Sequence, residues 1–322
     1  MVNRLWRRLI GAGIVEPAHD WEGKAASHPE LLDWLAAELM THDYDQKHIL
    51  RLIMTSELYA RSAVGSNLEA TAERRFFAAP ERRRMTAEQV VDSLFATSGQ
   101  HMEVEELTFD PDGRRPATTM ISLERPARAW EFTSLSNERD RPSLALPRAQ
   151  AVIDVLEAFG WIAARQSPVN QREISPNVLQ PGMLANSTLS TWITRASDGS
   201  PLAGLALHAP SVEALIDGLF LRLLTRMPRG DERDQARQLL QHGFSDRVVP
   251  ADQVRPNIPP EPLQRVSWTN HLHPDANSLK LVMEQRAHAG TPPDPRLRPD
   301  WRERYEDLIW SLINSPEFVW IP

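Results

Sequence analysis

The chain has 322 residues, of which 41% are hydrophobic and 25% are charged, a balance that is typical of a folded globular protein and excludes wholesale disorder. Its formal net charge of −7 provides no general attraction to nucleic-acid phosphates or to anionic membranes. The chain contains no cysteine, which excludes disulfides, thiol nucleophiles, iron–sulfur ligation and covalent haem attachment within it.

An amphipathic pattern begins at the N-terminus. Val2, Leu5, Trp6 and Ile10 fall on one side of a predicted helix. Because the pattern starts with the first residues, we interpret the chain as a dependent part of a larger protein and expect this apolar face to be exposed in the isolated chain. Gly11–Gly13 is too short to cradle a phosphate and is expected to end the helix.

Three further helix starts are marked by capping signals. Ser27-His-Pro-Glu30 combines a capping serine, a proline in the first turn and a glutamate three residues after the cap, so it predicts a helix that Ser27 caps. A helix from about Asp45 follows closely, and the two would form an αα-hairpin. Thr86-Ala-Glu-Gln89 is a capping box, and Gly99 marks the end of its helix.

Between about residues 100 and 147 the apolar residues no longer recur at helical spacing. Thr118–Leu123 and Ala129–Leu135 each have the composition of a short strand, so this segment is expected to be irregular with at most one small β-hairpin. Helical spacing then returns in six ranges: Ala149–Phe159, Asn177–Thr194, Ser211–Arg226, Asp231–His242, Ala276–His288 and Trp301–Asn314. The sequence therefore predicts a mainly α fold, a multi-helix orthogonal or bundle-like domain with an irregular central insertion.

These patterns divide the chain into four parts. They are an N-terminal helical part (1–99), the irregular insertion (100–147), a central helical part (148–244) and a proline-rich connection with C-terminal helices (245–322). We expect the four parts to form one continuous domain unit that belongs to a larger protein.

The sequence predicts no metal site. His271 and His273, followed by Asp275, are the nearest approach to a metal-ligand set, because two imidazoles at this spacing can share one metal. No third histidine lies near them in the sequence, and Asp275 directly precedes a predicted helix, where a carboxylate is favourable.

A second histidine motif also favours a structural interpretation. His42-Asp43 is similar to the adjacent ligand pair of helical metal-dependent phosphohydrolases, which need further ligands from facing helices. Combining the pair with His28 and His48 is a forced match, so we expect His42 and Asp43 at the solvent-exposed end of the first hairpin.

Basic and aromatic residues alternate in two short segments. Arg74-Arg-Phe-Phe77 and Glu81-Arg-Arg-Arg84 have the composition of a nucleic-acid-binding face. The acidic total argues against that function, and we expect Arg82–Arg84 to pair with Glu88 and Asp92 on the following helix.

Longer motifs occur at both ends of the chain. In the first hundred residues they are Asn3-Arg-Leu-Trp6, Gly11-x-Gly-Ile-Val-Glu-Pro17, Ser27-His-Pro-Glu-Leu-Leu-Asp-Trp-Leu35, Tyr44-Asp-x-Lys-His48, Leu52-Ile-x-Thr-Ser-x-x-Tyr59 and Arg83-Arg-Met-x-Ala-Glu88. In the remainder they are Phe159-Gly160, Leu184-Ala-Asn186, Leu223-Leu-x-Arg-x-Pro228 and Leu308-Ile-Trp-x-Leu-Ile-Asn-Ser-x-Glu-Phe318. This set resembles the family called domain of unknown function 1553, which is abundant in planctomycetes and related bacteria. Relatives typically have a cysteine-containing stretch where this chain has Arg165–Glu173 without cysteine, so no role tied to that stretch is carried over.

The resemblance implies a context rather than a reaction. In such proteins this domain follows another uncharacterised domain, often with a cytochrome-c-like module and a secretion signal further upstream. The resemblance therefore implies an exported parent protein, periplasmic or extracellular, with the upstream domain as the partner of this chain. It implies no cofactor in this chain, and any haem would belong to the linked upstream module. The family has no established reaction, so no catalytic residue is carried over.

Three functional hypotheses follow, of which the sequence favours the first and non-enzymatic one. The first is a non-catalytic helical module that packs on its upstream domain and supports binding or assembly. The second is a hydrolase-like enzyme acting on extracellular glycans or their esters, for which the candidate residues are His28, Asp33, Arg83, Arg84, Asp92, Arg139 and Asp140. The third is nucleic-acid binding through Arg74–Arg84, which the net charge disfavours. No stretch reaches the roughly 18 apolar residues of a membrane span, and the oligomeric state stays open.

Overall fold

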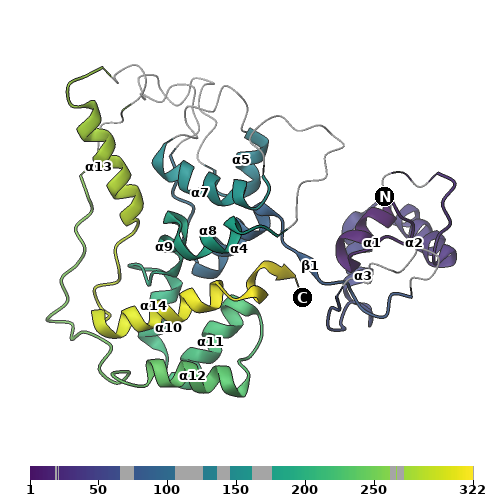
Figure 1. Ribbon diagram of the computed structural model, residues 1–322. Helices are drawn as coiled ribbons and strands as arrows, with labels where there is room; N and C mark the ends of the chain where they lie inside the picture. The colour runs from purple at the N-terminus through teal and green to yellow at the C-terminus, as the bar shows by residue number, and fades with distance from the viewer. Residues whose placement is uncertain are drawn as a thin grey trace. The chain divides into compact units, whose positions relative to one another are not determined.

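A computed structural model of the chain describes residues 1–18, 20, 22–65, 76–105, 126–135, 146–161, 176–261, 266 and 272–321. These residues are mainly helical, as predicted, and the one sheet within them pairs two strands of two residues each (Figure 1). The chain divides into two compact units, unit 1 with Met1–Arg84 and Trp320–Pro322 and unit 2 with Met85–Val319. Among the helices that the structure describes, none has the length and apolar character needed to cross a bilayer.

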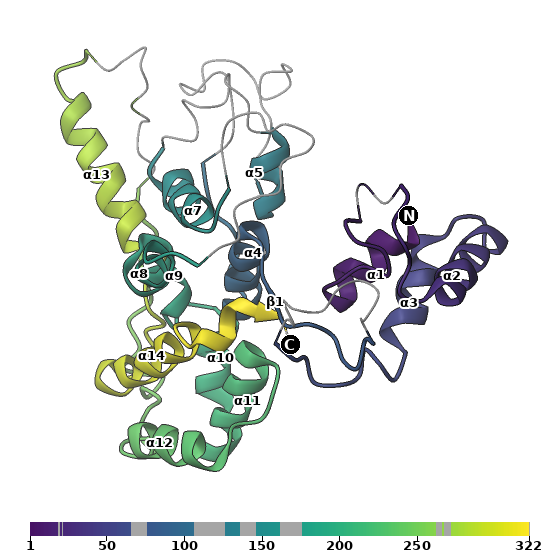
Figure 2. The ribbon, with the colours of Figure 1, turned by 45° about the vertical axis from the view of Figure 1, so that its right-hand side comes forward.

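Unit 1 packs three helices around one core (Figure 2). They are α1 (Val2–Ile10), α2 (Pro29–Thr41) and α3 (Gln46–Met54), and the unit also contains β1 (Arg83–Arg84) paired antiparallel with β2 (Trp320–Ile321). The buried core residues are Val2, Leu5, Trp6, Ile10, Ile14, Leu35, Leu39, Ile49 and Ile53. The apolar face of α1 is thus already covered by α2 and α3, and the expectation that it is exposed in the isolated chain is wrong.

Side chains of unit 1 fix the loop that follows α1. Gly11, with φ 101°, ends the helix as predicted, and a Cβ atom there would lie 2.6 Å from Cβ of Glu81. The buried amide of Asn3 donates to the carbonyl of Val15 at 2.9 Å and accepts from the Val15 N–H at 3.1 Å. Glu16 accepts from the N–H of Gly13 at 2.6 Å. These bonds replace the backbone partners that an irregular buried loop lacks.

The next two helices begin in different ways. Ser27 does not cap α2, because the N-cap is His28 and Pro29 is the first helical residue. The hydroxyl of Ser27 instead donates to the carbonyl of Ile14 at 3.0 Å and anchors the entry to the helix. Asp45 caps α3 by accepting from the N–H of Lys47 at 2.8 Å, which agrees with the predicted start of this helix.

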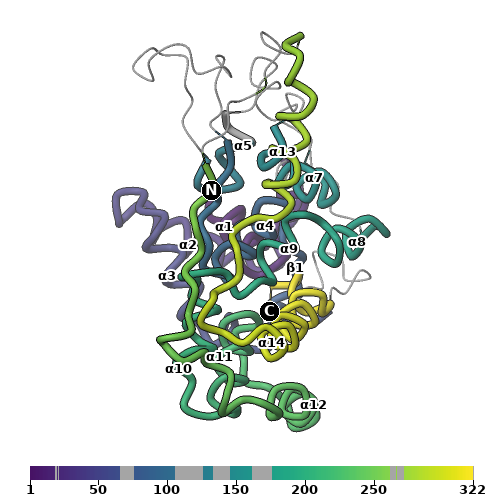
Figure 3. Tube along the Cα trace, turned by 90° about the vertical axis from the view of Figure 1, so that its left-hand side faces the viewer, coloured from purple at the N-terminus to yellow at the C-terminus, as the bar shows by residue number. Residues whose placement is uncertain are grey.

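Unit 2 contains the remaining helices of the described residues. They are α4 (Ala87–Ser98), α5 (Ala129–Leu135), α7 (Pro147–Ala158), α8 (Leu179–Asn186), α9 (Thr188–Thr194), α10 (Pro201–His208), α11 (Val212–Leu224), α12 (Gly230–Leu240), α13 (Ala276–Ala289), α14 (Pro299–Ile313) and the 3₁₀ helix η2 (Pro316–Val319). The helices α4, α7, α8 and α9 pack against one another, as do α11, α12 and α14, and the contact of α9 with α14 joins the two groups (Figure 3).

The capping signals of unit 2 are largely confirmed. Thr86 and Gln89 form the predicted capping box of α4, and Gly99 ends this helix in the left-handed conformation with φ 70°. The range predicted as one helix from Asn177 to Thr194 contains two, because the hydroxyl of Ser187 accepts from the N–H of Ser190 and starts α9.

The prediction of a strand at Ala129–Leu135 is wrong, since these residues form α5. The N–H of Ala129 donates to Oδ1 of Asp92 at 2.8 Å, which satisfies one of the donors that a helix start leaves unpaired. That partner lies 37 residues earlier in the chain, so the local composition does not reveal it. The second strand expected in this region, Thr118–Leu123, lies outside the described residues.

Candidate functional site

The residues predicted for a hydrolase site are divided between the two units. Unit 1 contains His28, Asp33, Arg83 and Arg84, unit 2 contains Asp92, and Arg139 and Asp140 lie outside the described residues.

His28 and Asp33 lie at the start of α2. His28 is the N-cap of the helix, its Nδ1 lies 3.1 Å from the hydroxyl of Ser27, and its ring centroid is 5.4 Å from that of Phe77. Asp33 is exposed on the helix surface. These surroundings give His28 a role at the start of the helix.

Arg83 and Arg84 form β1. They stand opposite Ile321 and Trp320 in the antiparallel pair with β2. Burial lowers the pKa of both guanidinium groups, and Tyr59 acts in the opposite direction on Arg83. The backbone of these two residues thus joins β1 to the C-terminal strand.

Asp92 is a half-buried carboxyl group on α4. Burial raises its pKa, while the hydrogen bond from the N–H of Ala129 acts to lower it. A raised carboxyl pKa is a feature of general acids. In this position, however, the carboxylate supports the start of α5.

The segment around His273 keeps the predicted arrangement only in part. Asp275 occupies the N-cap of α13, near the helix N-terminus as expected. Nδ1 of His273 lies 3.7 Å from Oδ2 of Asp275, and both side chains are largely exposed. His271 lies outside the described residues.

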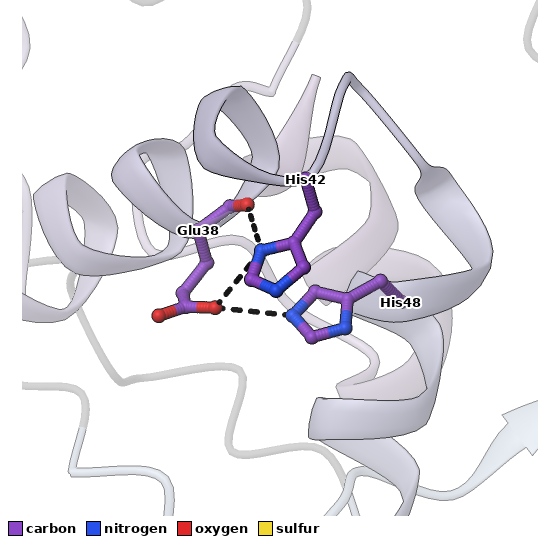
Figure 4. A group of neighbouring side chains, drawn as sticks. All are labelled: Glu38, His42 and His48. Carbon is purple, nitrogen blue, oxygen red and sulfur yellow. Dashed lines mark hydrogen bonds and ion pairs between the residues drawn. The ribbon is translucent and has the colours of Figure 1, made fainter.

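The structure brings together a different set of potential metal ligands, Glu38, His42 and His48, which we call the α2–α3 cluster (Figure 4). Nε2 of His48 lies 3.0 Å and Nδ1 of His42 lies 3.4 Å from the same carboxylate oxygen, Oε2 of Glu38. The two imidazole rings are stacked, with centroids 3.7 Å apart and planes 15° apart. Within the described ranges, this is the one place where three histidine, aspartate or glutamate side chains meet closely enough to hold a metal ion.

The local fold explains why these three side chains meet. Glu38 lies in the last turn of α2, and His42, four residues later, is the C-cap, so both side chains lie on the same face of the helix end. Asp43 and Tyr44, with φ 52° and 60°, then reverse the chain, so that His48 in the first turn of α3 returns to the end of α2. Left-handed backbone at two successive residues other than glycine is unfavourable.

Only part of this cluster was predicted from the sequence. His42 was expected at the solvent-exposed end of the hairpin, and its side chain is 46% exposed. His48 entered the prediction only in a forced combination with His28. Glu38 was not predicted, although its spacing of four residues from His42 at the end of a predicted helix was a usable signal.

Unit 2 contains a dense network of charged side chains at the junction of α11, α12 and η2. The guanidinium of Arg226 donates twice to Glu232, at 2.8 and 2.7 Å, and twice to Glu317, at 2.7 and 2.8 Å. These hydrogen bonds lower the pKa of Glu232 to about 2 and also lower the pKa of Glu317, whereas the pKa of Arg226 is raised. Both carboxylates are therefore held in their charged form by one arginine.

A groove of about 270 Å³ lies beside this network, between α11, α12 and α14. Its walls include Phe220, Leu239 and Leu308, and Arg226 and Glu317 contribute its polar side. The groove combines an apolar interior with a charged edge, the arrangement that small binding sites commonly have.

Comparison with protein families gives a context for these features. The family model described as "PSD1: Protein of unknown function (DUF1553)" matches residues 1–240. The match includes α1, α2 and α3 of unit 1, with the α2–α3 cluster, and continues in unit 2 to the end of α12. Comparisons with curated proteins and with solved structures gave no match.

Proposed function

The chain belongs to the PSD1 family of proteins of unknown function (DUF1553), and we propose that it is a non-catalytic helical module that supports binding or assembly within a larger exported protein. The observation that supports this proposal is the role of the residues that carry the family resemblance. In both units, their polar side chains form hydrogen bonds that hold loops and helices together.

The N-terminal motifs illustrate this role in unit 1. Asn3 forms two hydrogen bonds to the backbone of Val15, and Glu16 accepts from the N–H groups of Gly13 and Ala18. A loop held by so many side-chain bonds is well suited to presenting a fixed surface, and its polar groups are already occupied.

The later motifs contact one another in unit 2. Arg226 of the motif after α11 bonds to Glu317 of the C-terminal motif. The indole N–H of Trp310 donates to the carbonyl of Ala185 at 3.0 Å, which joins the C-terminal motif to α8. Segments that are far apart in the sequence are thus joined through residues of the motifs, as expected for a structural module.

The binding position that this proposal favours is the groove of unit 2. Since the apolar face of α1 is buried, it is not available for a partner. The groove can accept an apolar side chain of a linked domain, with its charged edge contributing polar contacts. In this proposal the upstream domain implied by the family resemblance is the partner, and any haem belongs to that linked part.

Binding between this chain and the separately produced upstream part of its parent polypeptide tests the proposal. We expect saturable binding by calorimetry, with a Kd on the order of 1 μM or tighter. Leu239→Glu, which puts a charge into the groove, should weaken binding, whereas Leu281→Glu on the exposed face of α13 should not.

The result that would overturn the proposal is the absence of association by the unchanged chain. Hydrolysis of aryl glycosides or aryl esters that disappears in Asp92→Asn would also overturn it, because the chain would then be an enzyme.

A further inference from the structure

We infer that Glu38, His42 and His48 form a binding site for a divalent transition-metal ion of the zinc class, which joins the end of α2 to the start of α3. This inference goes beyond the assembly role proposed above and does not depend on it. It rests on the donor set, the distances and the exposure of the α2–α3 cluster.

The donor set and its dimensions fit such an ion. Two imidazoles and one carboxylate are a common protein ligand set for zinc, whereas magnesium and calcium prefer oxygen donors alone. Two ligand atoms on one tetrahedral zinc ion lie about 3.4 Å apart, given metal–ligand bonds of roughly 2.0–2.1 Å. Nε2 of His48 lies 3.0 Å from Oε2 of Glu38, close to this separation. Each of the three side chains has a potential ligand atom within 4.8 Å of the other two, so rotations of the side chains would bring them to one ion.

The hydrogen bonds of His42 prepare its ring for this role. Nδ1 of His42 lies 2.9 Å from the backbone carbonyl oxygen of Glu38, which can only accept, so Nδ1 carries the proton. Nε2 of the neutral ring then has the free lone pair that a metal requires. A hydrogen bond from the second ring nitrogen to a backbone carbonyl is the usual way in which proteins orient a ligating histidine.

His48 and Glu38 complete the site from two different helices. In the absence of metal, Nε2 of His48 forms a hydrogen bond with the Glu38 carboxylate, and an ion placed between them would replace that hydrogen bond. The parallel rings of His42 and His48 already lie on the same side of the carboxylate (Figure 4).

Exposure of the cluster allows an ion to enter from solvent. The side chains of Glu38 and His48 are 27% and 26% exposed, and that of His42 is 46% exposed. With three protein ligands, a tetrahedral ion keeps a fourth position for water or for another donor. The site is thus able to join α2 to α3 and to offer an open position on the surface of unit 1.

Zinc titration of the full chain, stripped of metal with a chelator, tests this inference. We expect calorimetry with zinc chloride to show one saturable site, and magnesium chloride to show none. His42→Ala and His48→Ala should each weaken zinc binding by about tenfold or more, because each removes one ligand. Glu38→Gln, which keeps the shape of the side chain, should weaken binding in the same direction while circular dichroism confirms the fold.

His273→Ala is the matched control, since it removes another exposed histidine that has a nearby carboxylate. We expect this variant to bind zinc as the unchanged chain does. Ring-nitrogen NMR should show zinc-dependent shifts at His42 and His48. The inference is overturned if zinc does not bind, if binding survives in His42→Ala and His48→Ala, or if it is lost in His273→Ala instead.

Discussion

The two units use their polar side chains in different ways. In unit 2 the guanidinium of Arg226 donates to two carboxylates, those of Glu232 and Glu317. In unit 1 a single carboxylate, that of Glu38, is shared by two partly exposed imidazoles. Charged side chains whose hydrogen bonds are all made to other protein groups stabilise the fold. Partly exposed side chains with an atom that can still bind a ligand are available for binding.

Arg247 is a second example of the pattern in unit 2. This buried arginine donates to the backbone carbonyls of Ala206, Phe244 and Ala209 at 2.6, 2.8 and 2.8 Å, and its guanidinium lies 3.8 Å from the ring centroid of Phe244. Burial lowers its pKa. The side chain joins the end of α10 to the loop after α12, so its charge serves the fold.

The largest expected losses of stability come from substitutions in the cores of the two units. Ile49→Ala in unit 1 and Leu215→Ala in unit 2 each replace a side chain with 0% exposure. Each should lower the free energy of unfolding by about 3 kcal/mol, because a cavity is left in a packed core. We expect differential scanning calorimetry to show that each substitution shifts a different transition. A single transition that both substitutions shift equally would contradict the separation into two cooperative units.

Asn3→Ala should have the next largest effect and should act on unit 1. The substitution leaves both the N–H and the carbonyl of Val15 without their side-chain partners in a buried loop. A loss of about 2 kcal/mol is expected for two such groups. Chemical denaturation followed by the fluorescence of the buried Trp6, with Trp6→Phe identifying its signal, would measure the loss. A change below the experimental error would show that this loop does not depend on Asn3.

Arg226→Met should destabilise unit 2 by a smaller amount. The substitution leaves Glu232 and Glu317 without the arginine, but their side chains are 26% and 43% exposed, so water replaces part of the lost interaction. We expect a loss of about 1–2 kcal/mol in urea denaturation. Arg229→Met, which keeps the hydrogen bond from its backbone N–H to Glu232, is the control and should change stability less.

The same network predicts a pH dependence. The pKa of Glu232 is lowered from 4.5 to about 2 in the folded protein, and that of Glu317 is also lowered. Stabilisation by a carboxylate with a lowered pKa is fully present above its unfolded pKa and is lost as the pH falls through its folded pKa. Unit 2 should therefore lose stability as the pH falls from 4.5 towards 2, and Arg226→Met should reduce this slope. An equal slope in both proteins would show that other carboxylates determine the acid response.

The sequence predicted the elements whose signals are local. The Thr86–Gln89 capping box and the glycine after α4 were sufficient to define that helix, and the apolar stripe of α11 predicted its burial. The helix α5 was missed because it has only seven residues and its start is supported by the distant Asp92. The apolar face of α1 was also predicted, but the pattern alone does not reveal which helices cover that face.

The candidate site was harder to predict than the helices for a physical reason. Glu38 and His42 lie on one face at the end of a single helix, which sequence spacing can show. The position of His48 depends on the turn formed by Asp43 and Tyr44, whose left-handed backbone is uncommon for residues other than glycine. The packing of α2 against α3, which the sequence does not show, therefore brings the three side chains together.

Hydrogen–deuterium exchange of the full chain, with and without zinc, tests the division between the two units most directly. The account predicts that zinc slows exchange in the last turn of α2, at Asp43 and Tyr44, and in the first turn of α3, and leaves α11, α12 and α14 unchanged. Zinc-dependent protection in unit 2, or no change around the cluster at zinc concentrations that saturate the chain, would contradict it.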